Sequence, residues 1–151
     1  MDYPGIFISR SAQETKEFGY SLGHTYADAM PGIPVVCLWG DLGSGKTTFT
    51  QGFAKGLGIS GRLLSPTYII VRRYKLPAAT GYLYHADFYR INSPEDMDAF
   101  GISETLAESG SITIIEWPER MGTLLPKIRL DIRFRVMPDG EHEIRIDHIH
   151  T

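Results

Sequence analysis

Residues 35–48, VVCLWGDLGSGKTT, constrain the fold of this chain more than any other segment. The first five of them are continuously apolar, which is typical of a strand buried on both faces in the middle of a parallel sheet. Gly40 to Thr47 then match the pattern G-x-x-x-x-G-K-[ST] without a mismatch. A helical stretch follows to about Leu57, where Gly58 ends it. A buried strand, a glycine-rich loop and a helix in this order predict an α/β fold with a parallel core.

The glycine-rich loop predicts binding of a nucleoside triphosphate. Glycines let the backbone wrap around a phosphate with several N–H groups pointing inward. The N-terminus of the following helix adds its positive end. In this pattern Lys46 contacts the β- and γ-phosphates, and the hydroxyl of Thr47 binds Mg²⁺. The alternative is a glycine-rich turn with a surface lysine, and the position between a strand and a helix argues against it.

Two carboxylates are candidates for the acid that such a site needs near the metal. Glu116 ends the apolar run SITIIE, and Asp87 lies near the end of YLYHADFY. Either carboxylate would be costly to bury unpaired, so an ion pair at a sheet edge is the alternative role for each. We expect Glu116 to bind the metal and Asp87 to bind its water shell or the attacking water. The sequence leaves open which of the two is the direct ligand.

The rest of the chain predicts elements around this core. A capping box that starts at Ser11 predicts a helix over about 12–28. Residues 68–75 and 82–89 are β-branched and aromatic, and the PAATG between them predicts an antiparallel pair. Helical turns are expected from Ser93 to about Glu108.

The C-terminal part has the clearest alternation. In 127–136, KIRLDIRFRV, even positions are apolar and odd positions are charged, which predicts a strand with one buried face. Residues 141–149 return as the second strand of a hairpin. The predicted class is α/β: a single P-loop domain over residues 1–151, with a mixed sheet whose parallel core strands are flanked by antiparallel hairpins and helices.

Composition and charge argue against several classes of protein. Of 151 residues, 42% are apolar and 22% charged, as in an ordinary globular domain. Acids outnumber Lys and Arg by 18 to 15, and the net charge of −3 argues against a protein that coats DNA or RNA. The sequence contains neither a long apolar run nor a signal-peptide pattern, so we expect no membrane segment. With Cys37 as the single cysteine, a reducing cytoplasm is the default expectation.

Four segments, GDLGSGKTTF, SPTY, HADFYR and IEWPER, occur in this order in one short chain. Together they resemble the TsaE family, small bacterial P-loop ATPases required to make threonylcarbamoyladenosine (t6A) in tRNA. The resemblance extends from Ser11 to the C-terminal hairpin. Departures are small: Ser44 stands where alanine is common, and Tyr68 where phenylalanine is common. The resemblance implies ATP binding by Gly40, Asp41, Leu42, Gly43, Ser44, Gly45, Lys46, Thr47 and Thr48.

The resemblance also implies roles at the metal and the water. Thr47 and Glu116 would hold Mg²⁺, with Asp87 beside them. Asp87 and Trp117 would belong to the hydrolytic site, and residues 65–67 would form a switch-like loop in which Thr67 contacts the nucleotide. Family members act on the TsaB–TsaD heterodimer, and their ATP hydrolysis supports its turnover. Contact with tRNA is expected through that complex.

Several side chains have two candidate roles from the sequence. His85 is either a hydrogen-bonded strand histidine or a proton or phosphate partner, and Arg90 is either a solvated cation or a phosphate contact. Trp117 belongs either to the core or to a wall of the site. The odd face of 127–136 is either a solvated surface or a docking face for an acidic partner or tRNA phosphate; its cations are Lys127, Arg129, Arg133 and Arg135, with Arg145 nearby.

Two other functions compete with ATP hydrolysis. D-F-Y-R after a P-loop is also similar to uridine-kinase-like proteins, in which Asp87 would accept a proton from the acceptor hydroxyl. A non-catalytic nucleotide switch is the third possibility. No motif places an arginine finger or a water-orienting glutamine, so we expect slow hydrolysis by the isolated protein and completion of the site by the partner.

Overall fold

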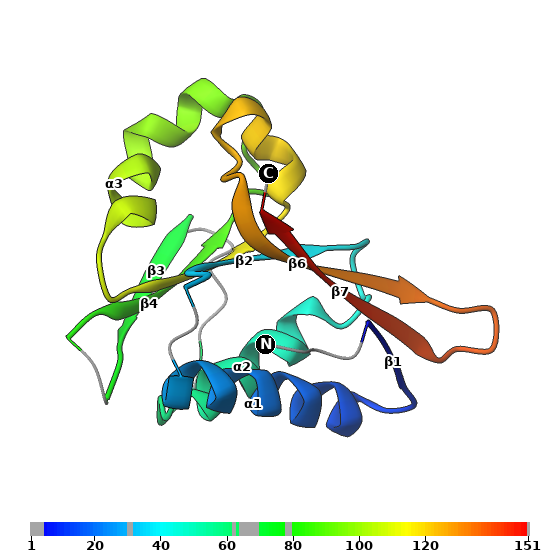
Figure 1. The fold of residues 1–151 in the computed structure, drawn as a ribbon. Helices are drawn as coiled ribbons and strands as arrows, with labels where there is room; N and C mark the ends of the chain where they lie inside the picture. The colour runs from blue at the N-terminus through cyan, green and yellow to red at the C-terminus, as the bar shows by residue number, and fades with distance from the viewer. Residues whose placement is uncertain (1–4, 30–31, 62, 64–69, 78–79, 151) are drawn as a thin grey trace.

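A computed structural model describes residues 5–29, 32–61, 63, 70–77 and 80–150, which form one seven-stranded sheet with helices on both faces (Figure 1). The strands are β1 (Ile6–Ser9), β2 (Val35–Trp39), β3 (Val71–Lys75), β4 (Tyr82–Asp87), β5 (Ile112–Glu116), β6 (Ile128–Val136) and β7 (His142–His150). The α-helices are α1 (Ala12–Ala29), α2 (Lys46–Gly56) and α3 (Ile102–Ala107), and the 3₁₀ segments are η1 (Pro94–Phe100) and η2 (Pro118–Leu124).

The strand order is β1-β7-β6-β2-β5-β4-β3. Strands β6, β2, β5 and β4 are parallel to one another, whereas β7 pairs antiparallel with β6 and with β1, and β3 pairs antiparallel with β4. The mixed α/β sheet is therefore as predicted, but its parallel core contains more strands than the sequence indicates. The first strand of the C-terminal hairpin, β6, pairs with β2 and is part of the core rather than a flank.

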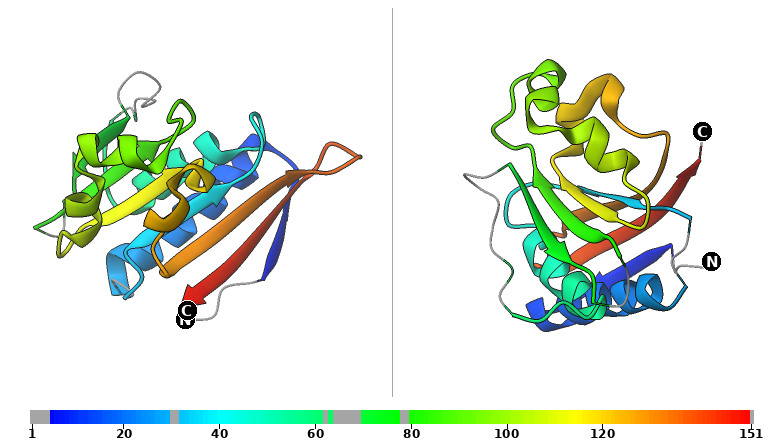
Figure 2. Two further views of the ribbon diagram at one scale, coloured as in Figure 1. Left: turned by 90° about the horizontal axis from the view of Figure 1, so that it is seen from above. Right: turned by 90° about the vertical axis from the view of Figure 1, so that its left-hand side faces the viewer.

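The two faces of the sheet have different covers. Helices α1 and α2 pack on one face, and η1, α3 and η2 lie over part of the other (Figure 2). Alternate residues of β2 separate accordingly: Val36 and Leu38 belong to the core against α1 and α2, while Val35 and Cys37 belong to the opposite core. The apolar run VVCLW is thus buried on both faces, as its sequence predicts.

The helix predictions hold with one adjustment. The Ser11 hydroxyl accepts from the N–H of Glu14 at 3.0 Å, and the Glu14 carboxylate reaches back to the N–H of Arg10 at 3.1 Å. The helical stretch after Ser93 is interrupted at Gly101, which has φ +68° and separates η1 from α3. The strand predicted from residue 68 begins, within the described residues, at Val71.

Helices α1 and α2 cross at very short range because four glycines face each other. A Cβ placed on Gly52 would lie 2.0 Å from the carbonyl oxygen of Lys16, and one on Gly23 would lie 2.1 Å from that of Phe53. Gly19 and Gly56 are as tightly placed. Phe18, Leu22 and Tyr26, whose spacing predicts the helix, pack beside this crossing. The close contact seats α2 against the sheet and so places its N-terminus.

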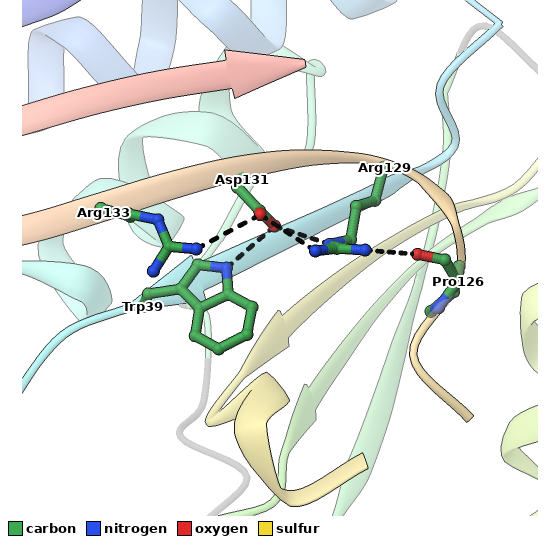
Figure 3. Close-up of polar contacts among 5 residues, drawn as sticks. All are labelled: Trp39, Pro126, Arg129, Asp131 and Arg133. Atoms are coloured by element: carbon green, nitrogen blue, oxygen red, sulfur yellow. Dashed lines mark hydrogen bonds and ion pairs between the residues drawn. The ribbon is translucent and has the colours of Figure 1, made fainter. Parts of the chain in front are cut away.

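The charged face of β6 is not the uniformly solvated surface that its alternation predicts. Asp131 is 1% exposed. It accepts hydrogen bonds from Trp39 Nε1 at 2.9 Å and from Arg129 Nε at 2.9 Å, and Arg129 also donates to the Pro126 carbonyl (Figure 3). The guanidinium of Arg133 stacks over the Trp39 ring at 4.6 Å. Because Asp131 is buried, its charge needs these partners.

Arg129→Met should therefore lower the free energy of unfolding by about 3 kcal/mol, since it removes one partner of a buried ion pair. Arg135→Met is the matched control on the same strand. Arg135 is exposed and pairs with Glu143 at 3.3 Å, so its loss should change stability by no more than about 1 kcal/mol. Urea unfolding of both variants measures the difference. Equal stabilities of the two variants would contradict this account of Asp131.

The docking role considered for this face stays a prediction. Arg129 is half-buried and pairs with Asp131, so the exposed cations that would carry such a role are Lys127, Arg133, Arg135 and Arg145. In the view from above, β6, β7 and β1 lie outside the cover of η1, α3 and η2, and α1 and α2 lie on the opposite face (Figure 2).

Candidate functional site

A cavity of about 600 Å³ opens where the carboxyl ends of the parallel strands meet the N-terminus of α2. This is the edge of an open parallel sheet at which ligands generally bind. The predicted residues that line it are Leu42, Gly43, Gly45, Lys46, Thr47, Thr48, Asp87, Glu116 and Trp117. Gly40, Asp41 and Ser44 do not line it. Thr67 and the SPT segment lie outside the described residues.

The backbone of the loop between β2 and α2 turns at three glycines. Gly40, Gly43 and Gly45 have positive φ values of 147°, 78° and 108°. A Cβ on Gly40 would lie 2.8 Å from the Phe134 carbonyl oxygen, so the loop passes too close to β6 for a side chain there. Gly45 begins α2 without a side-chain cap, which leaves the first-turn N–H groups available for an anion.

Lys46 is 5% exposed and its ammonium group lies at the centre of the site. Its Nζ donates to the Gly40 carbonyl at 2.5 Å and lies 4.1 Å from the centre of the Trp117 ring. Burial lowers the pKa of Lys46, whereas the nearby carboxylates, Glu116 first among them, act in the opposite direction. A buried cation between carboxylates and an uncapped helix start is suited to an anion that brings its own negative charge.

The two predicted carboxylates are brought together as neighbours. Asp87 and Glu116 are Cα partners in the parallel pairing of β4 and β5. Glu116 is 6% exposed, and its Oε2 lies 2.7 Å from Nε2 of His85. Asp87 is half-buried and accepts from the N–H of Tyr89 at 2.9 Å. Burial raises the pKa of Asp87, and the charge of Glu116 acts in the same direction.

The pKa of Asp87 is raised above the ordinary aspartate value of 3.8. At any pH above that value, ionisation of Asp87 therefore opposes folding. Asp87→Asn should therefore raise the melting temperature of the nucleotide-free, metal-free protein by a few degrees at neutral pH. The folded state holds the proton more tightly, so this gain should shrink as pH falls toward the ordinary value. Thermal melts over a pH series measure it, with the exposed Asp98→Asn as the control. An unchanged or lower melting temperature at neutral pH would contradict the argument.

Several residues at the cavity were not predicted. His142, at the start of β7, donates from Nδ1 to the Ser44 carbonyl at 2.8 Å, although 98 residues separate the two. Arg10 and Thr15 line the cavity from the N-terminal side. The Tyr89 ring contacts the Trp117 ring in a tilted arrangement, with the ring centroids 5.0 Å apart. No local signal marks these contacts, since they arise from strand pairing and not from spacing along the chain.

The structure places the three side chains that have two candidate roles each. His85 is a buried strand histidine bound to Glu116. Trp117 has both of its candidate roles, since it lines the cavity and also packs against the core on the face covered by η1, α3 and η2. Its φ of +60° and ψ of +50° lie in the left-handed region, and it is the only non-glycine residue with positive φ within the described segments. Arg90 is exposed and lines the cavity.

The oxygen-rich donor set fits Mg²⁺. The Thr47 hydroxyl and the carboxylates of Asp87 and Glu116 are hard oxygen ligands on the wall of one cavity. Within the described residues no group of three or more His, Cys, Asp and Glu side chains could cage a metal ion. Mg²⁺ usually binds through one or two carboxylates together with substrate phosphates and water, which matches this arrangement.

Over the described parts of the chain, no helix combines the length and apolar character that crossing a membrane requires.

The fold and the cavity define a class: a single-sheet α/β protein with a glycine-rich strand–loop–helix unit and two adjacent carboxylates at the carboxyl edge. The model of the family "Threonylcarbamoyl adenosine biosynthesis protein TsaE" matches residues 9–144. The chain belongs to the TsaE family.

Relatives from bacteria support this membership. A protein of Treponema pallidum named tRNA threonylcarbamoyladenosine biosynthesis protein TsaE is 38% identical over 139 residues, covering 92% of this chain and 97% of the relative. The protein of that name in Bacillus subtilis is 42% identical over 123 residues, covering 80% of this chain and 72% of the relative. The crystal structure of YdiB from Bacillus subtilis superposes with a TM-score of 0.76 at 33% identity, covering 95% of this chain and 84% of YdiB.

Proposed function

We propose that this protein binds ATP with Mg²⁺ at the cavity, hydrolyses it to ADP and phosphate, and thereby supports t6A formation in tRNA by acting on the TsaB–TsaD complex. The role in t6A biosynthesis follows from membership in the TsaE family. ATP as the nucleotide, the metal, the hydrolysis and the partner are our proposals.

One observation carries the chemical part of the proposal. The uncapped N-terminus of α2, the buried ammonium of Lys46 and the neighbouring carboxylates Asp87 and Glu116 converge on one cavity. A triphosphate needs backbone N–H donors and a cation, and its metal needs oxygen ligands. A structural turn would not require a buried lysine beside two carboxylates.

Each residue then has a role. The N–H groups at the start of α2 and the Nζ of Lys46 bind the phosphates. Thr47 and Glu116 would hold Mg²⁺, which when bound neutralises charge on the β- and γ-phosphate oxygens. Asp87, exposed to the cavity and not bound by a side chain within the described residues, orients water. Trp117 forms the wall beside Lys46 and keeps solvent from that side.

The isolated protein should hydrolyse ATP slowly. Two arginines line the cavity, Arg10 and Arg90, and both are exposed. Arg10 pairs with Glu141 at 3.0 Å, so its guanidinium is already engaged at the rim. We propose that the TsaB–TsaD pair completes or orders the site.

Phosphate release in the absence of any acceptor tests hydrolysis against the kinase alternative. We expect purified protein with Mg-ATP to release inorganic phosphate at a rate that added nucleosides or sugars do not change. Phosphate that appears instead on an added nucleoside or sugar would favour a small-molecule kinase with Asp87 as the base.

Asp87→Ala separates hydrolysis from a non-catalytic switch. We expect this variant to bind ATP and to fail both in hydrolysis and in repeated t6A turnover with the partner proteins. If repeated t6A turnover survives while hydrolysis is abolished, nucleotide binding alone suffices and the switch function is correct.

A further inference from the structure

One buried polar side chain in the core of the sheet has no role in the function proposed above. His85 lies in β4, two residues before Asp87, and is 1% exposed. Its Nε2 lies 2.7 Å from Oε2 of Glu116, on the neighbouring strand β5. Both side chains lie on the face of the sheet that packs against α2, beneath the cavity. A polar side chain at this depth costs stability unless it is hydrogen-bonded.

The direction of this hydrogen bond follows from the donors available. An ionised carboxylate only accepts, so Nε2 of His85 carries the hydrogen and donates it to Glu116. The other ring nitrogen, Nδ1, is buried and has no partner among the described residues. A hydrogen on Nδ1 would be buried without an acceptor, whereas a bare Nδ1 costs less. The surroundings therefore favour the ring with its hydrogen on Nε2.

Glu116 needs such a donor because of where it lies. Its neighbour in register is Asp87, a second carboxylate. The Lys46 ammonium is engaged with the Gly40 carbonyl and the Trp117 ring. Among the described residues, His85 is the only side chain that donates a hydrogen bond to Glu116. Without it, the flexible glutamate could turn away from Asp87 and lose a fixed orientation.

We propose that His85 is a positioning residue: by binding Oε2 it fixes the Glu116 carboxylate so that the other oxygen, Oε1, is directed to the metal. This inference rests on the proposed role of Glu116 as a Mg²⁺ ligand. Outer partners that orient metal ligands generally account for about 10–100-fold in metal affinity or activity. His85 thus acts through Glu116 and contacts neither nucleotide nor metal.

Two substitutions test the geometry of the donor. His85→Gln places an amide N–H₂ near the position of Nε2, whereas His85→Asn has an amide too short to reach Glu116. We expect His85→Asn to raise the Mg²⁺ concentration that gives half of the full Mg²⁺-dependent increase in melting temperature by about 10–100-fold. His85→Gln should keep this concentration close to the wild-type value. Two readouts are used: the Mg²⁺ dependence of the melting temperature at saturating ATP, and Mn²⁺ binding by electron paramagnetic resonance. ATP binding in EDTA should be unchanged in both variants.

A matched control lies one residue away on the same strand. Tyr84→Phe removes a hydrogen bond to Glu108 on the opposite face of β4, at 2.8 Å, and should leave Mg²⁺ dependence unchanged. Wild-type Mg²⁺ dependence in His85→Asn would overturn the inference. So would an equal loss in His85→Asn, His85→Gln and Tyr84→Phe, because the effect would then be a general loss of packing.

Glu116→Gln separates this inference from the proposed function. If Glu116→Gln keeps the wild-type Mg²⁺ dependence, Glu116 is not a metal ligand and the metal assignment fails together with the inference. If Glu116→Gln loses Mg²⁺ dependence while His85→Asn keeps it, the metal assignment stands and the positioning role of His85 is wrong.

Discussion

Lys46→Ala should lower kcat/KM for ATP hydrolysis by about 10²–10³-fold, the effect of removing one preorganised donor from developing charge. Lys46 is the buried cation at the start of α2, and its ammonium is held by the Gly40 carbonyl and the Trp117 ring. Without it, the phosphates would keep the backbone donors and lose their charged partner. ATP affinity measured by calorimetry should fall as well.

Lys55→Ala is the matched control for this prediction. Lys55 is an exposed lysine near the C-terminus of the same helix and does not line the cavity. Its removal changes the net charge by the same amount and should leave hydrolysis and ATP affinity as in the wild type. Equal activities in the Lys46→Ala and Lys55→Ala variants would show that the triphosphate is bound elsewhere.

Gly52→Ala should destabilise the fold by about 3 kcal/mol or more, at the upper end of the effect of overpacking a core. The added Cβ would lie 2.0 Å from the Lys16 carbonyl oxygen, so α1 and α2 must move apart. The helix propensity of alanine would favour the variant by about 1 kcal/mol, which is too little to offset this contact. Separation of the helices would also displace the start of α2 and weaken ATP binding.

Gly32→Ala is the corresponding control. Within the described residues nothing lies within 4 Å of a Cβ at Gly32, and Gly32 is not among the glycines with positive φ. Urea unfolding should give Gly32→Ala wild-type stability and a much lower midpoint for Gly52→Ala. A Gly52→Ala variant that unfolds at the wild-type midpoint would contradict the close crossing of the two helices.

Local patterns were sufficient to predict the centre of the site. The order of strand, glycine-rich loop and helix over residues 35–57 depends on neighbouring residues alone, and β2, the loop and α2 follow it. Asp87 and Glu116 could be predicted because each ends an apolar run, and carboxyl ends of parallel strands meet at one edge. The assignment of roles to these two acids stays a prediction.

Contacts between distant segments could not be predicted. The alternation in β6 is typical of a one-sided strand, and it does not show that Asp131 is buried or that Trp39 of the paired strand β2 binds it. The contact between His142 and the Ser44 carbonyl depends on where the β6–β7 hairpin lies. The helix crossing does have a signal in the sequence: Gly52 and Gly56 stand at i and i+4, a spacing that is typical of closely packed helices.

Phosphate release from Mg-ATP by the purified protein, measured alone and then with the TsaB–TsaD pair, tests the central claim most directly. The account predicts slow release by the protein alone and clear stimulation by the pair, by about 10³–10⁵-fold if the pair supplies an arginine. Both rates should vanish in Asp87→Ala. Fast release that the pair does not change, or no release under either condition, would contradict the proposal that this cavity is an ATPase site completed by its partner.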